Sequence, residues 1–285
     1  MGETKIEWTE ATWNPVTGCT KVSPGCSRCY AEAIDHRFNH DKVGKLPWAF
    51  PASRGGRGVT LHPERLDLPL QWKRPRMIFV NSMSDLFHED VPFEFIARVW
   101  DTMFTTLING PGHIYQILTK RPDRMLAFSK WMNEHELRRI DYDNAWLGVS
   151  VENQLWAERR ISILARISAR VRFVSVEPML GPVDLKPYFF QCSGCHQIPC
   201  ACKGLAIQQV ICGGESGPRF RPMNLDWARS LRDQCQTAGV PFFYKQSSGQ
   251  RPGTGRELDG RLWEEFPITS GLRTSIIEPD FMKKR

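Results

Sequence analysis

Three cysteines near the start of the chain have the spacing Cys19-x6-Cys26-x2-Cys29 and are followed directly by Tyr30. Cysteine thiolates are the usual ligands of iron–sulfur clusters, and a 4Fe-4S cube takes four of them. A cube held by only three cysteines keeps one iron free for an outside ligand, and an open coordination position usually serves catalysis. The triplet therefore predicts a catalytic metal centre.

A second group of cysteines lies in the segment 191–203, which reads QCSGCHQIPCACK. Four thiols in so short a loop are typical of a closed tetrahedral zinc site, with His196 more reasonably a bystander than a ligand. An auxiliary iron–sulfur cluster and a set of unligated thiols are the alternatives. The candidate ligands are Cys192, Cys195, Cys200 and Cys202. The remaining two cysteines, Cys212 and Cys235, are expected to be buried thiols.

The composition is that of an ordinary globular chain. Of 285 residues, 41% are hydrophobic and 24% are charged, which is enough apolar surface for a large core. The chain has no run of 18 apolar residues, and MGETKIEWTE at its start lacks the layout of a signal peptide. Seven of the nine cysteines fall in two tight groups, as in metal sites of a reducing compartment. We therefore expect a cytoplasmic protein without a membrane span.

The formal net charge of +7 favours an anionic partner, of which nucleic acid is the commonest. Basic residues gather at 54–57, 73–76 and 251–261, each in a glycine- or proline-rich setting that predicts a loop. Solvated surface charge without a partner is the alternative for each loop.

Short apolar stretches rich in β-branched and aromatic residues alternate with amphipathic stretches. Continuous apolar runs are typical of strands buried on both faces, and their alternation with helices predicts parallel βαβ units. The expected strands are 76–81, 113–118, 145–151, 171–176, 208–212 and 240–244, with a first strand around 7–13. The expected helices are 93–107, 154–167 and 225–238. Asn224 or Asp226 is the expected cap of the last helix.

A (β/α) barrel and a doubly wound open sheet both fit this alternation. Because no early G-x-G-x-x-G turn is present, we favour a partial or full (β/α) barrel of parallel strands. A single α/β domain is expected over 1–265, with the cysteine-rich segment 191–203 as a metal-binding insertion. The stretch 38–72 is expected to form a long loop, and 266–285 a C-terminal tail.

Polar residues follow nearly every expected strand. In a parallel barrel the carboxyl ends of the strands meet on one rim, where the active site is built. The cysteine loop follows the first expected strand, so it is expected on the same rim. The rim candidates are Ser82, Ser84, Asp85, Lys120, Arg121, Ser150, Glu152, Asn153, Glu177, Gly213, Gly214, Glu215 and Lys245.

Longer strings of residues resemble a known family. They are TGCTKVSPGCSRCYAE, VNSMSDLFHEDVP, LTKRPDR, GVSVEN, VSVEPMLGP, GGESGPRFRPM and PFFYKQ, and they extend from residue 17 to about 246. The chain is similar to a phage- and bacteria-associated three-Cys-motif family of unknown function that is regarded as radical S-adenosylmethionine-like. In that superfamily the first gap of the motif usually has three residues, whereas here it has six.

The resemblance implies a 4Fe-4S cluster on the three cysteines, with S-adenosylmethionine chelating the fourth iron. Reductive cleavage of this cofactor would give methionine and a 5′-deoxyadenosyl radical that takes a hydrogen atom from a substrate. Nucleic acid is the expected substrate, modified or repaired at a base or sugar. A flavodoxin- or ferredoxin-like reductant and a family partner protein are also implied. Lys21 and Arg28 are candidates to offset the charge of the cluster, with solvated loop charge as the alternative.

The resemblance also implies roles for the rim. Ser84 and Asp85 would contact the methionine amino group, and Lys120 or Arg121 the carboxylate, for which arginine is better suited. Glu152 would accept hydrogen bonds from the ribose. The further cofactor-binding candidates are Tyr30, Ser82, Ser150, Asn153, Gly213 and Gly214. The substrate-side catalytic candidates are Glu177, Glu215 and Lys245.

Two other classes of function are compatible with the cysteines. One is a non-catalytic nucleic-acid-binding protein in which both cysteine groups hold zinc. The other is redox chemistry at Cys26 and Cys29, which leaves Cys19 unexplained. The sequence contains neither a G-x-x-x-x-G-K-[ST] phosphate loop nor a G-x-S-x-G nucleophile elbow.

Overall fold

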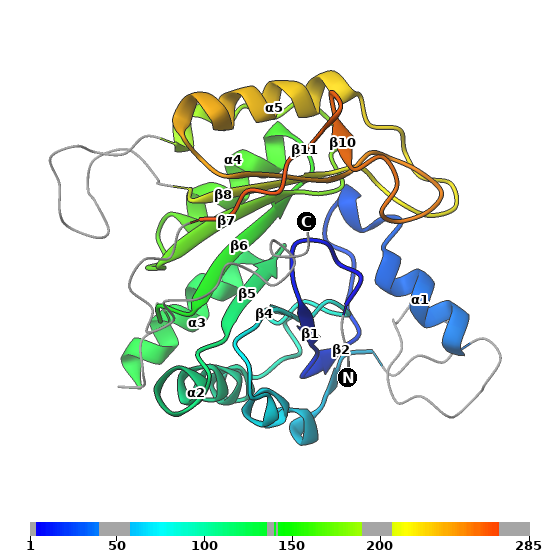
Figure 1. Ribbon diagram of the computed structural model, residues 1–285. Helices are drawn as coiled ribbons and strands as arrows, with labels where there is room; N and C mark the ends of the chain where they lie inside the picture. Colours follow the sequence, from blue (N-terminus) through cyan, green and yellow to red (C-terminus); the bar gives the residue numbers. More distant parts are fainter. Residues whose placement is uncertain (1–3, 40–57, 136–139, 141, 190–206, 268–285) are drawn as a thin grey trace, which may run out of the picture.

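A computed structural model describes residues 4–39, 58–135, 140, 142–189 and 207–267. At its centre a seven-stranded parallel sheet curls into a half-barrel (Figure 1). The strands, in sheet order, are β1 (Ala11–Trp13), β4 (Met77–Val80), β5 (Ile114–Thr119), β6 (Ala145–Val151), β7 (Val171–Val176), β8 (Gln209–Gly213) and β9 (Phe242–Gln246).

The order of the strands identifies the architecture as a partial barrel. Each strand is added at the same edge of the sheet, so that sheet order follows chain order from β1 to β9. A doubly wound sheet instead reverses its order after the first strands and carries helices on both faces. Because βαβ crossovers are right-handed, an unreversed order puts the connecting helices on one face only, as in a barrel.

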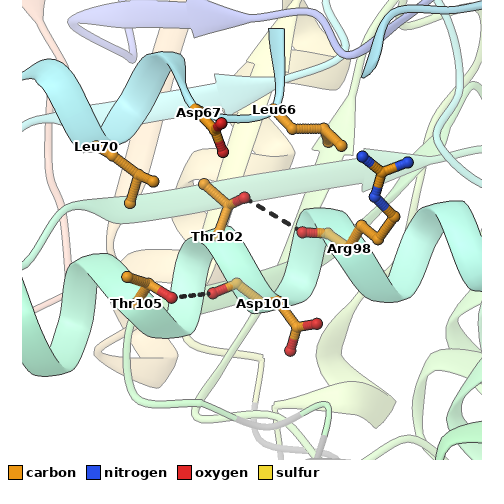
Figure 2. A pocket seen from close by; sticks show the side chains of 7 residues that line it. All are labelled: Leu66, Asp67, Leu70, Arg98, Asp101, Thr102 and Thr105. Carbon is orange, nitrogen blue, oxygen red and sulfur yellow. Dashed lines mark hydrogen bonds between the residues drawn. The ribbon is translucent and has the colours of Figure 1, made fainter. Parts of the chain in front are cut away.

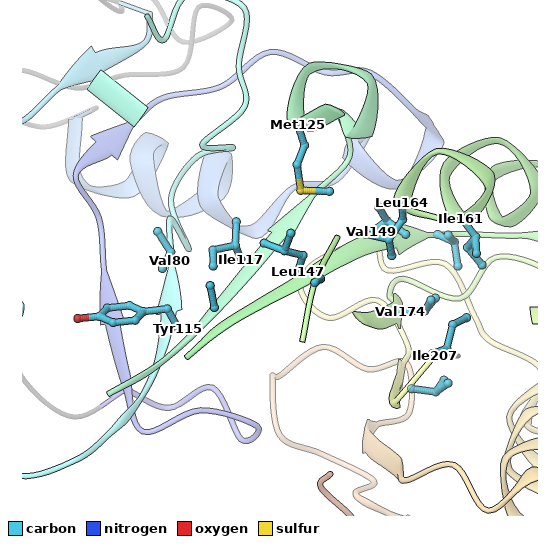
Figure 3. Close-up of a cluster of buried hydrophobic side chains, with 14 of the residues drawn as sticks. Val80, Tyr115, Ile117, Met125, Leu147, Val149, Ile161, Leu164, Val174 and Ile207 are labelled. Atoms are coloured by element: carbon cyan, nitrogen blue, oxygen red, sulfur yellow. The ribbon is translucent and has the colours of Figure 1, made fainter. Parts of the chain in front are cut away.

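Four helices cover the outer face of the half-barrel. They are α2 (Phe93–Asn109), α3 (Pro122–Glu134), α4 (Gln154–Leu164) and α5 (Leu225–Ala238). Their apolar faces form one buried cluster with every second residue of the strands, among them Leu147, Val149 and Val174 (Figure 3). Asn224 caps α5, since its side chain accepts a hydrogen bond from the backbone of Asp226. The sequence predicted three of these helices and missed α3.

The concave face of the sheet has its own apolar floor. Along each strand, side chains that point to the concave face alternate with those that point to the outer helices. Together with Trp8, the concave-face side chains form a second buried cluster of Met77, Phe79, Ile114, Trp146, Val171, Phe173, Ile211 and Phe243. Gly148 is needed in this floor, because a Cβ there would lie 2.5 Å from the ring of Phe173. Burial of each large aromatic side chain contributes about 2–3 kcal/mol, so the floor is a packed layer rather than a channel.

Smaller elements surround the sheet. The strand β2 (Val16–Thr17) pairs with β3 (Thr60–Leu61), and β10 (Glu257–Leu258) pairs with β11 (Arg261–Leu262), both antiparallel. The helix α1 (Tyr30–Asn39) follows the cysteine loop. The 3-10 helices are η1 (Pro24–Cys26), η2 (Pro63–Arg65), η3 (Leu68–Gln71) and η4 (Lys186–Tyr188).

Several sequence predictions can be compared with these elements. Cys212 and Cys235 are fully buried, as expected. The second cysteine group with Cys192, Cys195, Cys200 and Cys202, the tail from 268 and the part of the long loop from 40 to 57 lie outside the described residues. Among the helices of the described ranges, none combines the length and the apolar character needed to cross a membrane.

Candidate functional site

The loop that carries the three cysteines runs from β2 to α1 and lies against the carboxyl end of β4. The backbone N–H of Gly18 donates to Met83 O at 3.2 Å, and Gly18 also forms an isolated parallel bridge with Ser84. At the other end of the loop, the hydroxyl of Tyr30 donates to Ser82 O. The cysteine loop and the segment 82–84 after β4, both of which were predicted on the rim, are therefore in direct contact.

Arg121, which follows β5, attaches the loop at Cys19. Its Nη1 donates to the Sγ of Cys19 at 3.5 Å, and its Nη2 donates to Thr20 O at 3.0 Å and Thr20 Oγ1 at 2.7 Å. The guanidinium is 8% exposed and lies 3.6 Å from Asp85 and 3.1 Å from Glu89. Arg121 is thus held by two carboxylates with its charge directed at a thiol.

The carboxylate of Asp85 joins the ends of β4 and β5. Its Oδ1 accepts hydrogen bonds from Thr119 Oγ1 at 2.7 Å and from the backbone of Phe87 at 3.0 Å. Its Oδ2 accepts one from the backbone of Lys120 at 3.0 Å. Ser84 Oγ donates to Val16 O at 2.9 Å. The predicted contacts of Asp85 and Ser84 with a cofactor must therefore compete with bonds inside the protein.

A buried network at the end of β6 holds the middle of the loop. Ser23 Oγ donates to Glu152 Oε1 at 2.5 Å, and Arg160 Nη1 donates to both carboxylate oxygens of Glu152 at 3.3 and 3.1 Å. Glu152 is fully buried and Arg160 is 2% exposed. A Cβ on Gly25 would lie 2.3 Å from Glu152 Oε1, so the loop backbone can approach this carboxylate only with a glycine there.

The end of β8 makes the fourth attachment. Arg221 Nη1 donates to Pro24 O at 3.0 Å, and Arg221 also binds Glu215 at 2.5 Å. Arg28 lies 3.5 Å from Glu215, which is itself 6% exposed. Although burial opposes it, hydrogen bonds and charge from these two arginines hold the pKa of Glu215 below its usual value. Lys21, the other predicted counter-charge, is instead paired with Glu32 at 2.8 Å.

The three thiols are near one another but do not converge on one point. Burial and the charge of Asp85 raise the pKa of Cys19 to about 12, against a smaller opposing effect of Arg121. Burial also raises the pKa of Cys29, against hydrogen bonds from the backbone of Glu32 and Ala31 and the charge of Lys120. The charge of Cys26 raises the pKa of both Cys19 and Cys29. Across the described ranges, no three His, Cys, Asp or Glu side chains are gathered closely enough to hold a single metal ion.

Glu177 and Lys245 lie together on the concave face, beyond the apolar floor. Lys245 Nζ is 2.5 Å from Glu177 Oε1, and the two side chains are 15% and 20% exposed. A Cβ on Gly213, in the strand between them, would lie 3.4 Å from Glu177 and 3.5 Å from Lys245. Gly214 allows a closer backbone approach, since its Cβ would lie 2.3 Å from the backbone nitrogen of Ser248.

Other predicted residues have structural partners. The side chain of Asn153 accepts a hydrogen bond from the backbone of Trp156 and caps α4. Ser150 is buried, and its carbonyl accepts a hydrogen bond from Arg160 at 2.7 Å. The sequence reading missed Ser23, Arg160 and Arg221. Only Arg221 had a usable signal, because it lies in the string GGESGPRFRPM with Glu215.

Two surface pockets lie elsewhere. One, of about 240 Å³, is between η3 and α2 and is lined by Leu66, Asp67, Leu70, Arg98, Asp101, Thr102 and Thr105 (Figure 2). The other, of about 670 Å³, is between η4 and α5. Neither is lined by a residue of the cysteine loop or of the strand ends, so the candidate site is the rim of the half-barrel and not these pockets.

Comparison with known proteins assigns the chain to a family. Searches of curated proteins and of solved structures gave no match. A family model described as "Protein of unknown function (DUF5131)" matches residues 3–267, which is nearly the whole chain. The chain, with its half-barrel and its cysteine loop, therefore belongs to this family.

Proposed function

We propose that this protein is a radical S-adenosylmethionine enzyme with a 4Fe-4S cluster on Cys19, Cys26 and Cys29. The observation that carries the proposal is the attachment of the cysteine loop to the carboxyl ends of β4, β5, β6 and β8 through bonds to Met83, Arg121, Glu152 and Arg221. Catalytic groups of barrel enzymes lie on this rim. The attachment of the cysteine loop to four strand ends on this rim supports a role in an active site rather than in a separate metal-binding knuckle.

The set of ligands fits a cluster better than a single ion. Each thiolate of a 4Fe-4S cube binds a different iron, whereas the ligands of a zinc ion all bind the same atom. The three sulfur atoms around a cube therefore lie further apart in space than the sulfur ligands of one zinc ion. Thiols with a raised pKa, as at Cys19 and Cys29, are protonated at neutral pH, and metal binding would displace their protons. Arg121, at 3.5 Å from Cys19 Sγ, would offset part of the negative charge of the bound cluster.

The concave face supplies a place for the organic cofactor and the substrate. When bound, the cluster and S-adenosylmethionine would supply a 5′-deoxyadenosyl radical that abstracts hydrogen from the substrate. The apolar floor excludes water from below, while Glu177 and Lys245 present one acceptor and one donor group. Ser175, two residues before Glu177 on the same face, has a buried Oγ without a partner in the described part of the chain. A bound polar ligand would satisfy this hydroxyl.

The test is anaerobic reconstitution with iron and sulfide, followed by reduction with S-adenosylmethionine present. We expect the visible absorption and electron paramagnetic resonance of a 4Fe-4S cluster, and formation of 5′-deoxyadenosine. Replacement of Cys19, Cys26 or Cys29 by Ala should each abolish both the cluster signal and the product. The matched control is Cys235→Ala, in the outer core on α5, which should bind iron like the wild type.

A competing outcome would identify a different class of protein. Stoichiometric zinc, no visible absorption and no 5′-deoxyadenosine would overturn the proposal in favour of a non-catalytic, zinc-containing nucleic-acid-binding protein. A cluster signal without product in the absence of substrate would leave the cluster assignment standing, so the assay is repeated with single-stranded nucleic acid present.

A further inference from the structure

Two arginine-bearing loops lie side by side at the carboxyl end of the sheet, one after β8 and one after β9 (Figure 1). Ser216 forms a parallel bridge with Gly249. The backbone N–H of Gly217 donates to Gly249 O at 2.9 Å, and that of Gly249 donates to Glu215 O at 3.1 Å. The two loops therefore form one continuous surface.

This surface continues into the cysteine loop. The guanidinium of Arg28 donates to the carbonyl oxygen of Arg219, and that of Arg221 donates to Pro24 O at 3.0 Å. A ligand bound along the two loops would therefore lie next to Cys26 and Cys29. We call the surface formed by Arg28, the segment 215–221 and the segment 249–254 the arginine rim.

The arginine rim has an excess of positive charge. It carries four arginines and one carboxylate, that of Glu215, which is 6% exposed and already lies beside Arg28 and Arg221. Arg219 and Arg251 are exposed, and neither makes an ion pair with another residue of the described ranges. A second carboxylate, that of Glu7, adjoins the rim, since its Oε1 would lie 3.1 Å from a Cβ on Gly253. With Glu7 counted, the rim keeps an excess of two positive charges, and it presents the two guanidinium groups of Arg219 and Arg251 to an anion.

We infer that the arginine rim binds the phosphate backbone of a single-stranded nucleic acid. Guanidinium groups form bidentate hydrogen bonds with phosphate, and spaced arginines follow a backbone of repeated phosphates better than a single small anion. Phe220, half-buried between Arg219 and Arg221, offers a ring on which a base can stack.

The choice of a single strand rests on the proposed function. Glu177 and Lys245 lie on the concave face, and their side chains are only 20% and 15% exposed, so the pair is recessed from the surface. A base inside a duplex cannot reach a recessed site without being flipped out, whereas an unpaired base can enter directly. The same arginines would bind DNA or RNA backbones, so both are used as probes.

The experiment is fluorescence anisotropy of the full-length protein with labelled single strands of about 16 nucleotides, as DNA and as RNA, over a series of salt concentrations. The test variant is Arg219→Gln combined with Arg251→Gln. Each lost phosphate contact should lower the slope of log affinity against log salt by about 0.7, so the pair should lower it by about 1.4. Affinity at low salt should fall about tenfold or more.

The matched control replaces two exposed arginines outside the arginine rim and outside the basic loops of the sequence, Arg159→Gln and Arg166→Gln, which changes the net charge equally. This control should keep the salt slope of the wild type. An equal loss in both double variants would show general charge attraction and would overturn the inference, as would tighter binding of a duplex than of the single strand. All variants change exposed side chains, so thermal unfolding should be unaltered.

Failure of this inference is distinguishable from failure of the proposed function. Formation of 5′-deoxyadenosine with unchanged binding by the Arg219/Arg251 variant would overturn the arginine rim alone. Binding that depends on these arginines, in a protein that forms neither cluster nor product, would overturn the radical chemistry alone. A preference for the DNA or the RNA probe would identify which of the two nucleic acids is the ligand.

Discussion

Glu177 and Lys245 form an ion pair across a strand to which neither belongs. Glu177 follows β7, Lys245 lies in β9, and β8 runs between them with Gly213 at the crossing point. The register of β8 and β9 shifts between Cys212 and Gly213. The carboxylate and the ammonium meet at 2.5 Å above Gly213, where an added Cβ would be in ordinary van der Waals contact with both side chains.

We predict that this pair is energetically coupled. Lys245→Met leaves the Glu177 carboxylate without its cation in a site that is mostly shielded from water, and Glu177→Gln leaves the ammonium without its anion. The double variant removes both charges. A double-mutant cycle by urea unfolding should give a coupling free energy of about 1–2 kcal/mol. Additive single effects would mean that solvent screens the pair fully.

The contact between Arg121 and Cys19 predicts that Arg121 helps to hold and tune the proposed 4Fe-4S cluster. Outer partners of metal ligands typically contribute 10–100-fold to metal affinity or activity, so Arg121→Gln should lower iron retention or product formation by about that factor. Loss of a positive charge beside the sulfur should also lower the reduction potential of the cluster. Redox titration followed by electron paramagnetic resonance measures this shift.

The control for this variant is Arg124→Gln. Arg124 lies in α3 and donates to His88 O and Val91 O, with its guanidinium 4.3 Å from the ring centre of Phe93. Its loss should lower stability but leave the reduction potential unchanged. Equal potentials in both variants and the wild type would contradict a specific role for Arg121.

We predict that Glu152 contributes strongly to the stability of the fold, independently of any cofactor. Glu152→Ala leaves the Arg160 guanidinium buried without its carboxylate and frees Ser23 in the cysteine loop, at a cost of about 3–5 kcal/mol. The control is Glu158→Ala on α4, the helix that carries Arg160. The exposed carboxylate of Glu158 accepts a hydrogen bond from Gln154, and the change should stay within about 0.5 kcal/mol. Urea unfolding at pH 7 compares them, and equal effects would rule out the buried network.

His113 should make the protein less stable in mild acid. Burial lowers the pKa of its ring from 6.5 to about 4, with Nε2 donating to Pro69 O at 3.1 Å. The unfolded chain then binds a proton at higher pH than the folded chain, so stability is lost as pH falls from about 6.5 to about 4. The pKa difference corresponds to about 3 kcal/mol.

The measurement is urea unfolding of the wild type and of His113→Gln over this pH range. The glutamine keeps a donor for Pro69 O but does not titrate. Its stability should therefore fall less steeply with decreasing pH than that of the wild type, whatever its level at pH 7. Parallel curves for the two proteins would show that His113 is not the group responsible.

The sequence by itself determined the elements whose signal is local. The predicted strands at 145–151 and 171–176 and the predicted helix at 225–238 agree with β6, β7 and α5 residue for residue, because long apolar or amphipathic runs carry their periodicity within themselves. The two-residue strands β2, β3, β10 and β11 are too short for such a signal. The helix α3 was missed because its apolar face is narrow and gives a weak helical periodicity; the residues of this face are Met125, Phe128 and Met132.

The tertiary structure alone decided how the strands close and which side chains meet. Barrel and doubly wound sheets have the same alternation along the chain, and only the order of strands in space separates them. Likewise, nothing near Cys19 in the sequence indicates Arg121, which is 102 positions away, or the contact of Ser23 with Glu152, 129 positions apart. Thiol spacing is a local property, whereas the charges around a thiol depend on which strand ends the fold brings beside it.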